Sequence, residues 1–191
     1  MNLYDDIEPL RVRGYASVFD RTYGRTGDMV RIAPGAFADL TDSGIYACYG
    51  HDPEHRFASV GAGTLRIWQD SYGLAFDFEV PSSWGGIWLA SRIRAGEFRE
   101  ASMMLETLES RRVVENSRDV EVVTRGSIRE ISITAAGANP WTCVWLDDEG
   151  EDLHPYAAGA RARWQAGRMK AVLAKRKPKA ASLPPPAVPP P

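Results

Sequence analysis

Lysine is absent from the first 150 of the chain's 191 residues, and all four lysines lie in the last 22 positions. Residues 1–150 hold 15 basic and 23 acidic residues, a net charge of −8, whereas residues 151–191 hold 8 basic and 2 acidic residues, a net charge of +6. An acidic body repels phosphate, so we expect no specific nucleic-acid binding by the folded part of the chain.

The sequence also lacks the marks of membrane, secreted, metal-binding and nucleotide-binding proteins. No apolar run approaches the roughly 18 residues that span a bilayer, and the N-terminus, MNLYDDIEPLRVRG, is acidic where a signal peptide is basic. The two cysteines, Cys48 and Cys143, form neither a disulfide framework nor a zinc motif, and we expect reduced, buried thiols. No phosphate loop, dinucleotide fingerprint or His-Glu-x-x-His motif is present. We therefore expect a cytoplasmic protein with no cofactor, no metal ion and no membrane contact.

The body of the chain is predicted to consist mainly of β-strands. Residues 10–18 alternate between apolar and polar side chains, the pattern of a half-buried strand. Similar patterns predict strands at residues 28–34, 45–49, 64–68, 74–80, 120–124, 127–134 and 142–146, with turn-rich connections at 20–27 and 69–73. Many strands around one clear helix favour a mainly β chain with helices (α+β), folded as a small, mostly antiparallel β-barrel or sandwich.

Within the body, helices are predicted at two places and remain an alternative at a third. The segment Pro81-Ser82-Ser83 supplies helix-start signals and Gly96 a stop, and a brief helix is predicted at residues 35–40. Three apolar side chains are expected on one face of the longer helix: Trp84, Ile87 and Trp88. Residues 99–114 are ambiguous, because their composition favours a helix while their apolar side chains also alternate as in a strand.

The change in composition near residue 150 predicts three parts. Residues 1–150 form the folded domain, and residues 151–177, rich in Ala, Arg and Lys, form a basic, helical tail. Residues 178–191 hold seven of the 13 prolines and are expected to be a disordered, Pro-rich terminus.

Few residues stand out as carriers of chemistry. His154 lies near the end of the body, and His55 lies in a predicted polar loop, Pro53-Glu-His-Arg56, so both are expected to be solvent-exposed. His51 instead follows a short apolar run and precedes Asp52. A histidine at a strand end can act as a general base near neutral pH. A structural role for His51 is the alternative.

Ser102 and Glu130 are the other two candidates. Ser102 has apolar neighbours, so its hydroxyl needs a hydrogen-bond partner, which can be the backbone alone. Glu130 lies inside a predicted strand, where a carboxylate commonly pairs with an arginine such as Arg129 or Arg125. Taken singly, neither residue indicates a catalytic site.

The order of several short motifs along residues 10–145 is more specific. The motifs are Gly14-Tyr-Ala-Ser-Val-Phe-Asp20, Ile32-Ala-Pro-Gly-Ala-Phe37, Gly50-His-Asp52, Val60-Gly61, Asp70-Ser-Tyr-Gly-Leu74, Glu100-Ala-Ser-Met103, Arg129-Glu-Ile-Ser-Ile-Thr134 and Ala138-Asn-Pro140. This succession resembles the prohead (procapsid) maturation serine proteases of tailed bacteriophages and gene transfer agents, which are related to the herpesvirus assemblins.

The resemblance implies an assemblin-type fold and a catalytic set. It makes His51 the base, Ser102 the nucleophile and Glu130 the third, acidic member, with Asp52 as the alternative for that third position. It also implies a strand over residues 100–108. The chain departs from its relatives at Met103-Met104-Leu105, directly after the candidate nucleophile.

The implied function is cleavage of the scaffolding segment of the major capsid protein, and of the protease itself, inside the prohead that assembles in the cytoplasm of the bacterial host. Self-association is expected by analogy with the assemblins, and the basic tail either recruits the enzyme to acidic capsid segments or has no partner. Two alternatives are a catalytically inactive capsid-assembly or scaffolding module and an unrelated β-barrel binding protein. The second of these would place His51 and Ser102 far apart.

Overall fold

The computed structural model describes residues 10–25, 27–37 and 40–147. The predicted basic tail (151–177), the Pro-rich terminus (178–191) and His154 lie outside the described residues.

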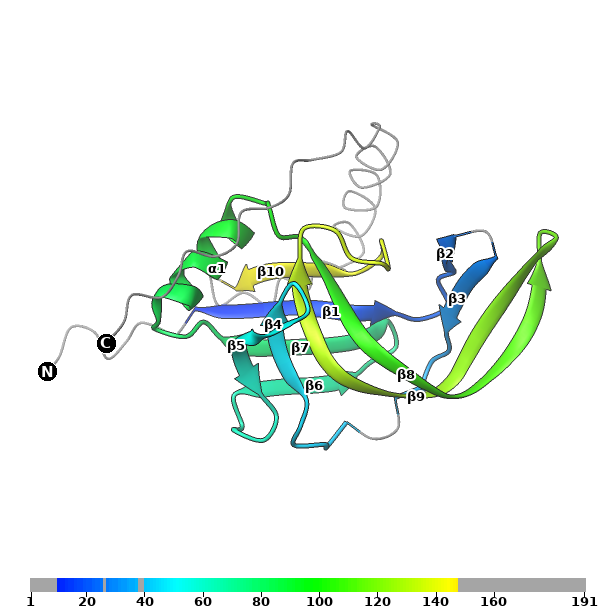
Figure 1. The fold of residues 1–191 in the computed structure, drawn as a ribbon, viewed down its shortest axis with the longest axis horizontal. Helices are drawn as coiled ribbons and strands as arrows, with labels where there is room; N and C mark the ends of the chain where they lie inside the picture. The colour runs from blue at the N-terminus through cyan, green and yellow to red at the C-terminus, as the bar shows by residue number, and fades with distance from the viewer. Residues whose placement is uncertain (1–9, 26, 38–39, 148–191) are drawn as a thin grey trace, which may run out of the picture. The chain divides into compact units, whose positions relative to one another are not determined.

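The described residues form ten strands and one helix, so the prediction of a mainly β chain is confirmed (Figure 1). The elements are β1 (Arg11–Val18), β2 (Tyr23–Arg25), β3 (Asp28–Ile32), β4 (Tyr46–Tyr49), β5 (Asp52–Ser59), β6 (Leu65–Gln69), β7 (Gly73–Glu79), α1 (Trp84–Arg94), β8 (Glu100–Glu115), β9 (Arg118–Thr134) and β10 (Cys143–Asp147).

The strands are arranged in two sheets. The first has the order β10-β1-β7-β6, and all its neighbours are antiparallel. The second has the order β2-β3-β9-β4-β5, in which β9 pairs in parallel with β3 and with β4. Strand β8 pairs antiparallel with β9 along the whole length of β9, so β3 and β4 share the opposite edge. Among the described strands the pairing leaves two separate sheets, and the predicted closed barrel is not confirmed.

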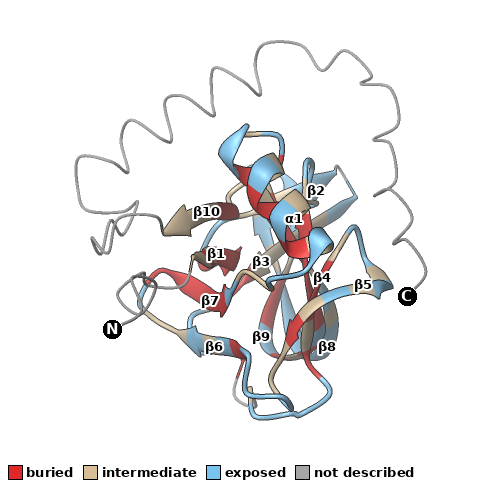
Figure 2. Cartoon of the chain, turned by 90° about the vertical axis from the view of Figure 1, so that its left-hand side faces the viewer, coloured by how far each residue is buried: buried red, intermediate tan, exposed pale blue. Residues whose placement is uncertain are grey.

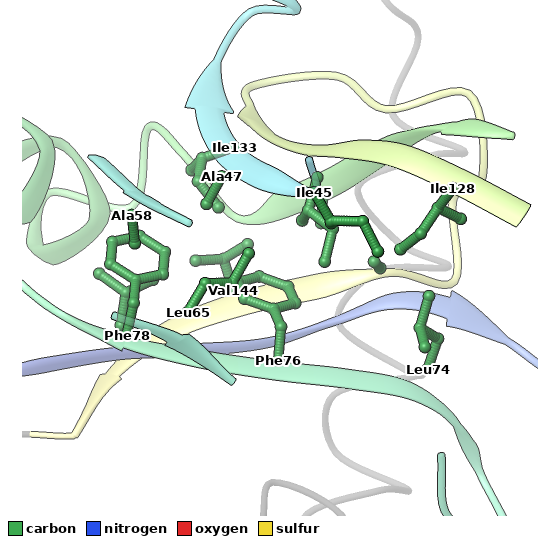
Figure 3. Close-up of a cluster of buried hydrophobic side chains, with 14 of the residues drawn as sticks. Ile45, Ala47, Ala58, Leu65, Leu74, Phe76, Phe78, Ile128, Ile133 and Val144 are labelled. Carbon is green, nitrogen blue, oxygen red and sulfur yellow. The ribbon is translucent and has the colours of Figure 1, made fainter. Parts of the chain in front are cut away.

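The hydrophobic core lies between the two sheets (Figure 3). The first sheet contributes Leu65, Leu74, Phe76, Phe78 and Val144. The second sheet contributes Ala47, Ala58, Ile128 and Ile133, and Ile45 lies directly before its strand β4. The alternation within β7 sends its apolar side chains to one face, where each large one contributes about 1.5–3 kcal/mol through burial.

The predicted helix forms, and it packs one face against the core. Its N-cap is Ser83, whose Oγ accepts a hydrogen bond from the backbone N–H of Gly86, and the chain leaves the helix through Gly96 at a φ of 69°. The buried residues are Gly86, Leu89, Ala90 and Ile93 (Figure 2). Of the three residues predicted to share a face, Trp84 and Ile87 are exposed and Trp88 packs partly against the core.

The ambiguous segment is a strand. Residues of β8 pair with β9 from Glu100 opposite Thr134 to Glu115 opposite Arg118, and the two strands run as one long curved hairpin (Figure 1). Asn116 and Ser117 form its turn with φ values of 50° and 61°, as a two-residue hairpin turn with the matching twist requires. Pairing along a whole neighbouring strand outweighs the local helix propensity of β8.

Four further local predictions were wrong. The connection at residues 20–27 contains strand β2, and the brief helix at 35–40 is absent from the described residues of that segment. The polar segment around Pro53 is strand β5 rather than a loop. Strand β5 is the last in its sheet, and a proline is tolerated there because an edge strand needs no outward N–H. The two strands predicted at 120–124 and 127–134 are one continuous strand, β9.

No helix within the described part of the chain has the length and apolarity needed to span a bilayer.

We expect Phe76→Ala to lower the free energy of unfolding by about 3–5 kcal/mol, because it leaves a cavity between the two sheets. The matched control is Ile87→Ala on the exposed side of α1, which should change it by about 0.5 kcal/mol or less. Urea unfolding followed by fluorescence measures both. Similar losses in the two variants would contradict the assignment of the core.

Candidate active site

The second half of β9 has two faces of different chemistry. Ile131 and Ile133 are buried on the core side, whereas Glu130 and Ser132 point to the opposite face. Although that face is polar, Glu130 is only 1% exposed and Ser132 is fully buried. Buried polar groups of this kind must find partners within the protein.

His51 is the main partner of Glu130. Its Nδ1 lies 2.6 Å from Glu130 Oε1, and about 45% of the imidazole side chain is exposed. A buried carboxylate beside Nδ1 favours the tautomer that carries its proton there. The Nε2 atom is then unprotonated and able to accept a proton from another group.

The position of His51 results from the tight turn between β4 and β5. Gly50 and His51 have φ values of 61° and 63°, in the left-handed region. The backbone N–H of Gly50 donates to the carbonyl oxygen of Ile133 at 3.2 Å, and the backbone N–H of His51 donates to Ser132 Oγ at 2.7 Å. The turn is thus attached to β9 next to Glu130.

Ser102 lies across β9 from the β4 strand. In the strand register Ser102 is opposite Ser132, and Ser132 is opposite Cys48 of β4, so the three form a row across the sheet. Side chains directly opposite each other on paired strands have Cβ atoms about 4.5–5.5 Å apart. The described hydrogen bonds do not include one between Ser102 and His51. Ser132 is next to both, because it is opposite Ser102 in the register and its Oγ accepts the backbone N–H of His51. The structure therefore brings all three candidates into one small region.

Strand β8 is anchored one residue before Ser102. The backbone N–H of Ala101 donates to Thr142 Oγ1 at 3.1 Å, and the Thr142 hydroxyl donates to the carbonyl oxygen of Ala101 at 2.6 Å. Both residues are buried, so these two hydrogen bonds hold in place the backbone that carries Ser102.

Asp52, the alternative acid, makes other contacts. Its Oδ2 lies 2.9 Å from Nδ1 of His55, and its Oδ1 accepts the backbone N–H of Glu54 at 2.9 Å. These hydrogen bonds, that from Glu54 first, lower the pKa of Asp52. His55, predicted to be exposed, is about 40% exposed and pairs with Asp52.

The arginines expected to pair with Glu130 lie elsewhere. Arg129 is 3.8 Å from Glu106, and Arg125 is 3.2 Å from Glu109. Their positions along β9 place both arginines beside other carboxylates. The expectation that one of them pairs with Glu130 was therefore wrong.

Sequence reasoning did not assign any role to Cys48 or to Ser132. The thiol of Cys48 donates to Glu130 Oε2 at 3.0 Å, and its sulfur lies 3.8 Å from Ser132 Oγ. Both cysteines are free and buried, as expected. Burial, with the neighbouring Glu130 carboxylate, raises the pKa of Cys48 to about 12. The only hint in the sequence is that Cys48 stands three residues before His51, and Ser132 two residues after Glu130.

A surface pocket of about 500 Å³ lies beside these residues. It is lined by Asp42, Gly44, Tyr46, Met104, Glu106, Ser127, Ile128 and Arg129. In the register Tyr46 and Met104 flank Glu130 on its two sides. Within the described residues no group of three or more His, Cys, Asp or Glu side chains is placed to hold a metal ion.

Comparisons with known proteins place this geometry in context. No curated protein matches the chain. Among solved structures, the chain is similar to KSHV protease, crystallised in complex with a hexapeptide phosphonate inhibitor, with 14% identity and a TM-score of 0.46. That match covers 88% of this chain and 78% of the other. A likeness this distant transfers no residue role.

The family comparison is more direct. The sequence model of the family described as "Caudovirus prohead serine protease" matches residues 4–153, most of the chain and all of its described residues. The resemblance found in the ordered motifs is thereby confirmed. The chain belongs to the prohead serine proteases of caudoviruses, and it is a serine-type peptidase of phage capsid maturation.

Proposed function

We propose that the chain cleaves the scaffolding segment of the major capsid protein, and itself, with Ser102 as nucleophile, His51 as general base and Glu130 as the third catalytic residue. The observation that carries the assignment is the 2.6 Å contact between His51 Nδ1 and the buried Glu130 carboxylate, beside the strand that holds Ser102.

In the proposed reaction Ser102 Oγ attacks the carbonyl carbon of the scissile peptide bond while Nε2 of His51 takes the hydroxyl proton. His51 then gives this proton to the leaving amine, the C–N bond breaks, and an ester to Ser102 remains. Water, deprotonated by His51, hydrolyses the ester and restores the hydroxyl. Glu130 holds the imidazole by Nδ1 and stabilises its protonated form at each step.

We propose that the substrate binds as an extended strand along the outer edge of β8. At Ala101 the backbone groups on this edge are hydrogen-bonded to Thr142. From Met103 onward no described strand pairs with the outer edge of β8. An unpaired edge beside a nucleophile can bind an extended peptide through backbone hydrogen bonds, with side chains entering neighbouring pockets. The pocket next to Met104 is in position to receive one of them.

The charge distribution supports different roles for different segments of the chain. Residues 1–150 would form the protease domain, and the family match, which ends at residue 153, is consistent with that boundary. The basic segment 151–177 would bind acidic capsid or scaffold segments inside the assembling prohead, in the host cytoplasm. Residues 178–191 would be a disordered, Pro-rich end, and the protease would act as a homo-oligomer.

Ser102→Ala should abolish processing of co-expressed capsid protein and labelling by a serine-reactive fluorophosphonate, because no hydroxyl remains to attack. Ser110→Ala, on the exposed part of the same strand, is the matched control and should behave like the wild type. Gel electrophoresis and mass spectrometry measure both. Processing by Ser102→Ala at the wild-type rate would refute the nucleophile assignment. An unprocessed capsid protein that still binds the wild-type chain would instead favour a scaffolding role.

Glu130→Gln should lower the rate of processing by about 10⁴-fold, the scale seen when the acid of a Ser-His-Asp triad becomes an amide. Asp52→Asn should have little effect, because Asp52 faces His55. The same processing assay, with thermal unfolding to verify folding, compares the two. A larger loss in Asp52→Asn would identify Asp52 as the third residue.

A further inference from the structure

Four contacts, two of them fully buried, form a closed ring behind the imidazole of His51. The imidazole Nδ1 contacts Glu130 Oε1, and Cys48 Sγ donates to Glu130 Oε2 at 3.0 Å. The Cys48 sulfur lies 3.8 Å from Ser132 Oγ, and Ser132 Oγ accepts the backbone N–H of His51 at 2.7 Å. The ring joins β4, the β4–β5 turn and β9.

Each oxygen of a buried carboxylate needs a donor, because water cannot supply one. His51 satisfies Oε1 of Glu130, and Cys48 satisfies Oε2. The raised pKa of Cys48 keeps its thiol protonated at neutral pH, so it offers a hydrogen and no second negative charge. Without this donor the Glu130 side chain would be free to rotate toward another partner.

The Ser132 hydroxyl holds the backbone of the same histidine. His51 has a φ of 63°, a conformation that side chains with a Cβ rarely adopt and that must be held by its surroundings. Ser132 and Cys48 are both fully buried, so neither can contact a substrate. Any influence they have on the reaction must pass through His51 and Glu130.

We propose that Cys48 and Ser132 are positioning residues of the catalytic pair: the thiol fixes the second oxygen of Glu130, and the hydroxyl fixes the turn that carries His51. The proposal rests on the function proposed above and adds two residues that act through its base and its acid.

The charged and titratable groups around His51 and Glu130 determine how the pair responds to pH. Strand β4 presents Cys48, and β5 presents Asp52 and His55, which contact each other. The adjacent positions of β8, Ser102 and Met104, do not titrate near neutral pH. Apart from His51, Cys48 is the only one of these groups that donates a hydrogen bond to Glu130. Its removal should therefore change the pH dependence of the His51–Glu130 pair.

The test measures the second-order rate of fluorophosphonate labelling of the full chain at Ser102 between pH 5 and 9. Cys48→Val replaces the donor by an apolar group, and Cys48→Ser keeps a donor. Cys143→Val is the matched control, a buried cysteine on β10 in the other sheet. Ser132→Ala tests the hydroxyl, and thermal unfolding reports the folding of every variant.

We expect Cys48→Val to lower the plateau rate about tenfold, on the scale of lost outer-shell support. The acid limb of its pH–rate profile should move to higher pH by about one unit. A carboxylate that loses a donor is less stable as an anion, so the His51–Glu130 pair holds its proton more tightly. Cys48→Ser should restore the limb, Ser132→Ala should lower the plateau, and Cys143→Val should leave the profile unchanged.

Two results would overturn the positioning role. One is a wild-type profile in Cys48→Val and Ser132→Ala while Ser102→Ala is unlabelled, which would leave the proposed function intact. The other is an equal loss in Cys48→Val, Cys48→Ser and Cys143→Val with no shift of the acid limb, which would indicate packing alone. If Cys48→Val does not fold, Cys48→Ala takes its place. Equal labelling of Ser102→Ala and the wild type would refute the proposed function itself.

Discussion

The alternation of side chains along the second half of β9 is the constraint on which the rest of the structure depends. Ile131 and Ile133 enter the core between the sheets, and Glu130 and Ser132, which alternate with them, point to the opposite face. A shift of one residue in the pairing would expose the isoleucines and send the carboxylate into the core. Burial of the core and placement of the polar group are therefore set by the same register.

Burial of Glu130 has consequences for the strands around β9. A desolvated carboxylate requires donors, and these come from two segments far away in the sequence, the end of β4 and the turn after it. The turn accepts two left-handed residues in succession to bring His51 to the carboxylate. Backbone strain and polar satisfaction are thus concentrated in one place, as is common at functional sites.

The local sequence pattern predicted the elements whose structure depends on local interactions. Strand β7 followed from its alternation and α1 from its N-cap and its glycine stop. Strand β8 did not, because its residues favour a helix and only the pairing with β9 makes it extended. The sequence did not predict which face of α1 is buried for a related reason, since the sheets that it packs against, and not its own largest side chains, select that face.

By itself the sequence determined the family, through motifs in a specific order, and it supplied the short list of His51, Ser102, Glu130 and Asp52 as candidates. Only the tertiary structure decided which of the two acids contacts His51 and which other side chains surround that contact. The physical reason is distance along the chain. His51 and Glu130 are 79 residues apart, Cys48 and Glu130 are 82 apart, and the parallel pairing of β4 with β9 brings them together. No local propensity encodes the register of two strands so widely separated, because that register is set by burial on both faces of the sheet.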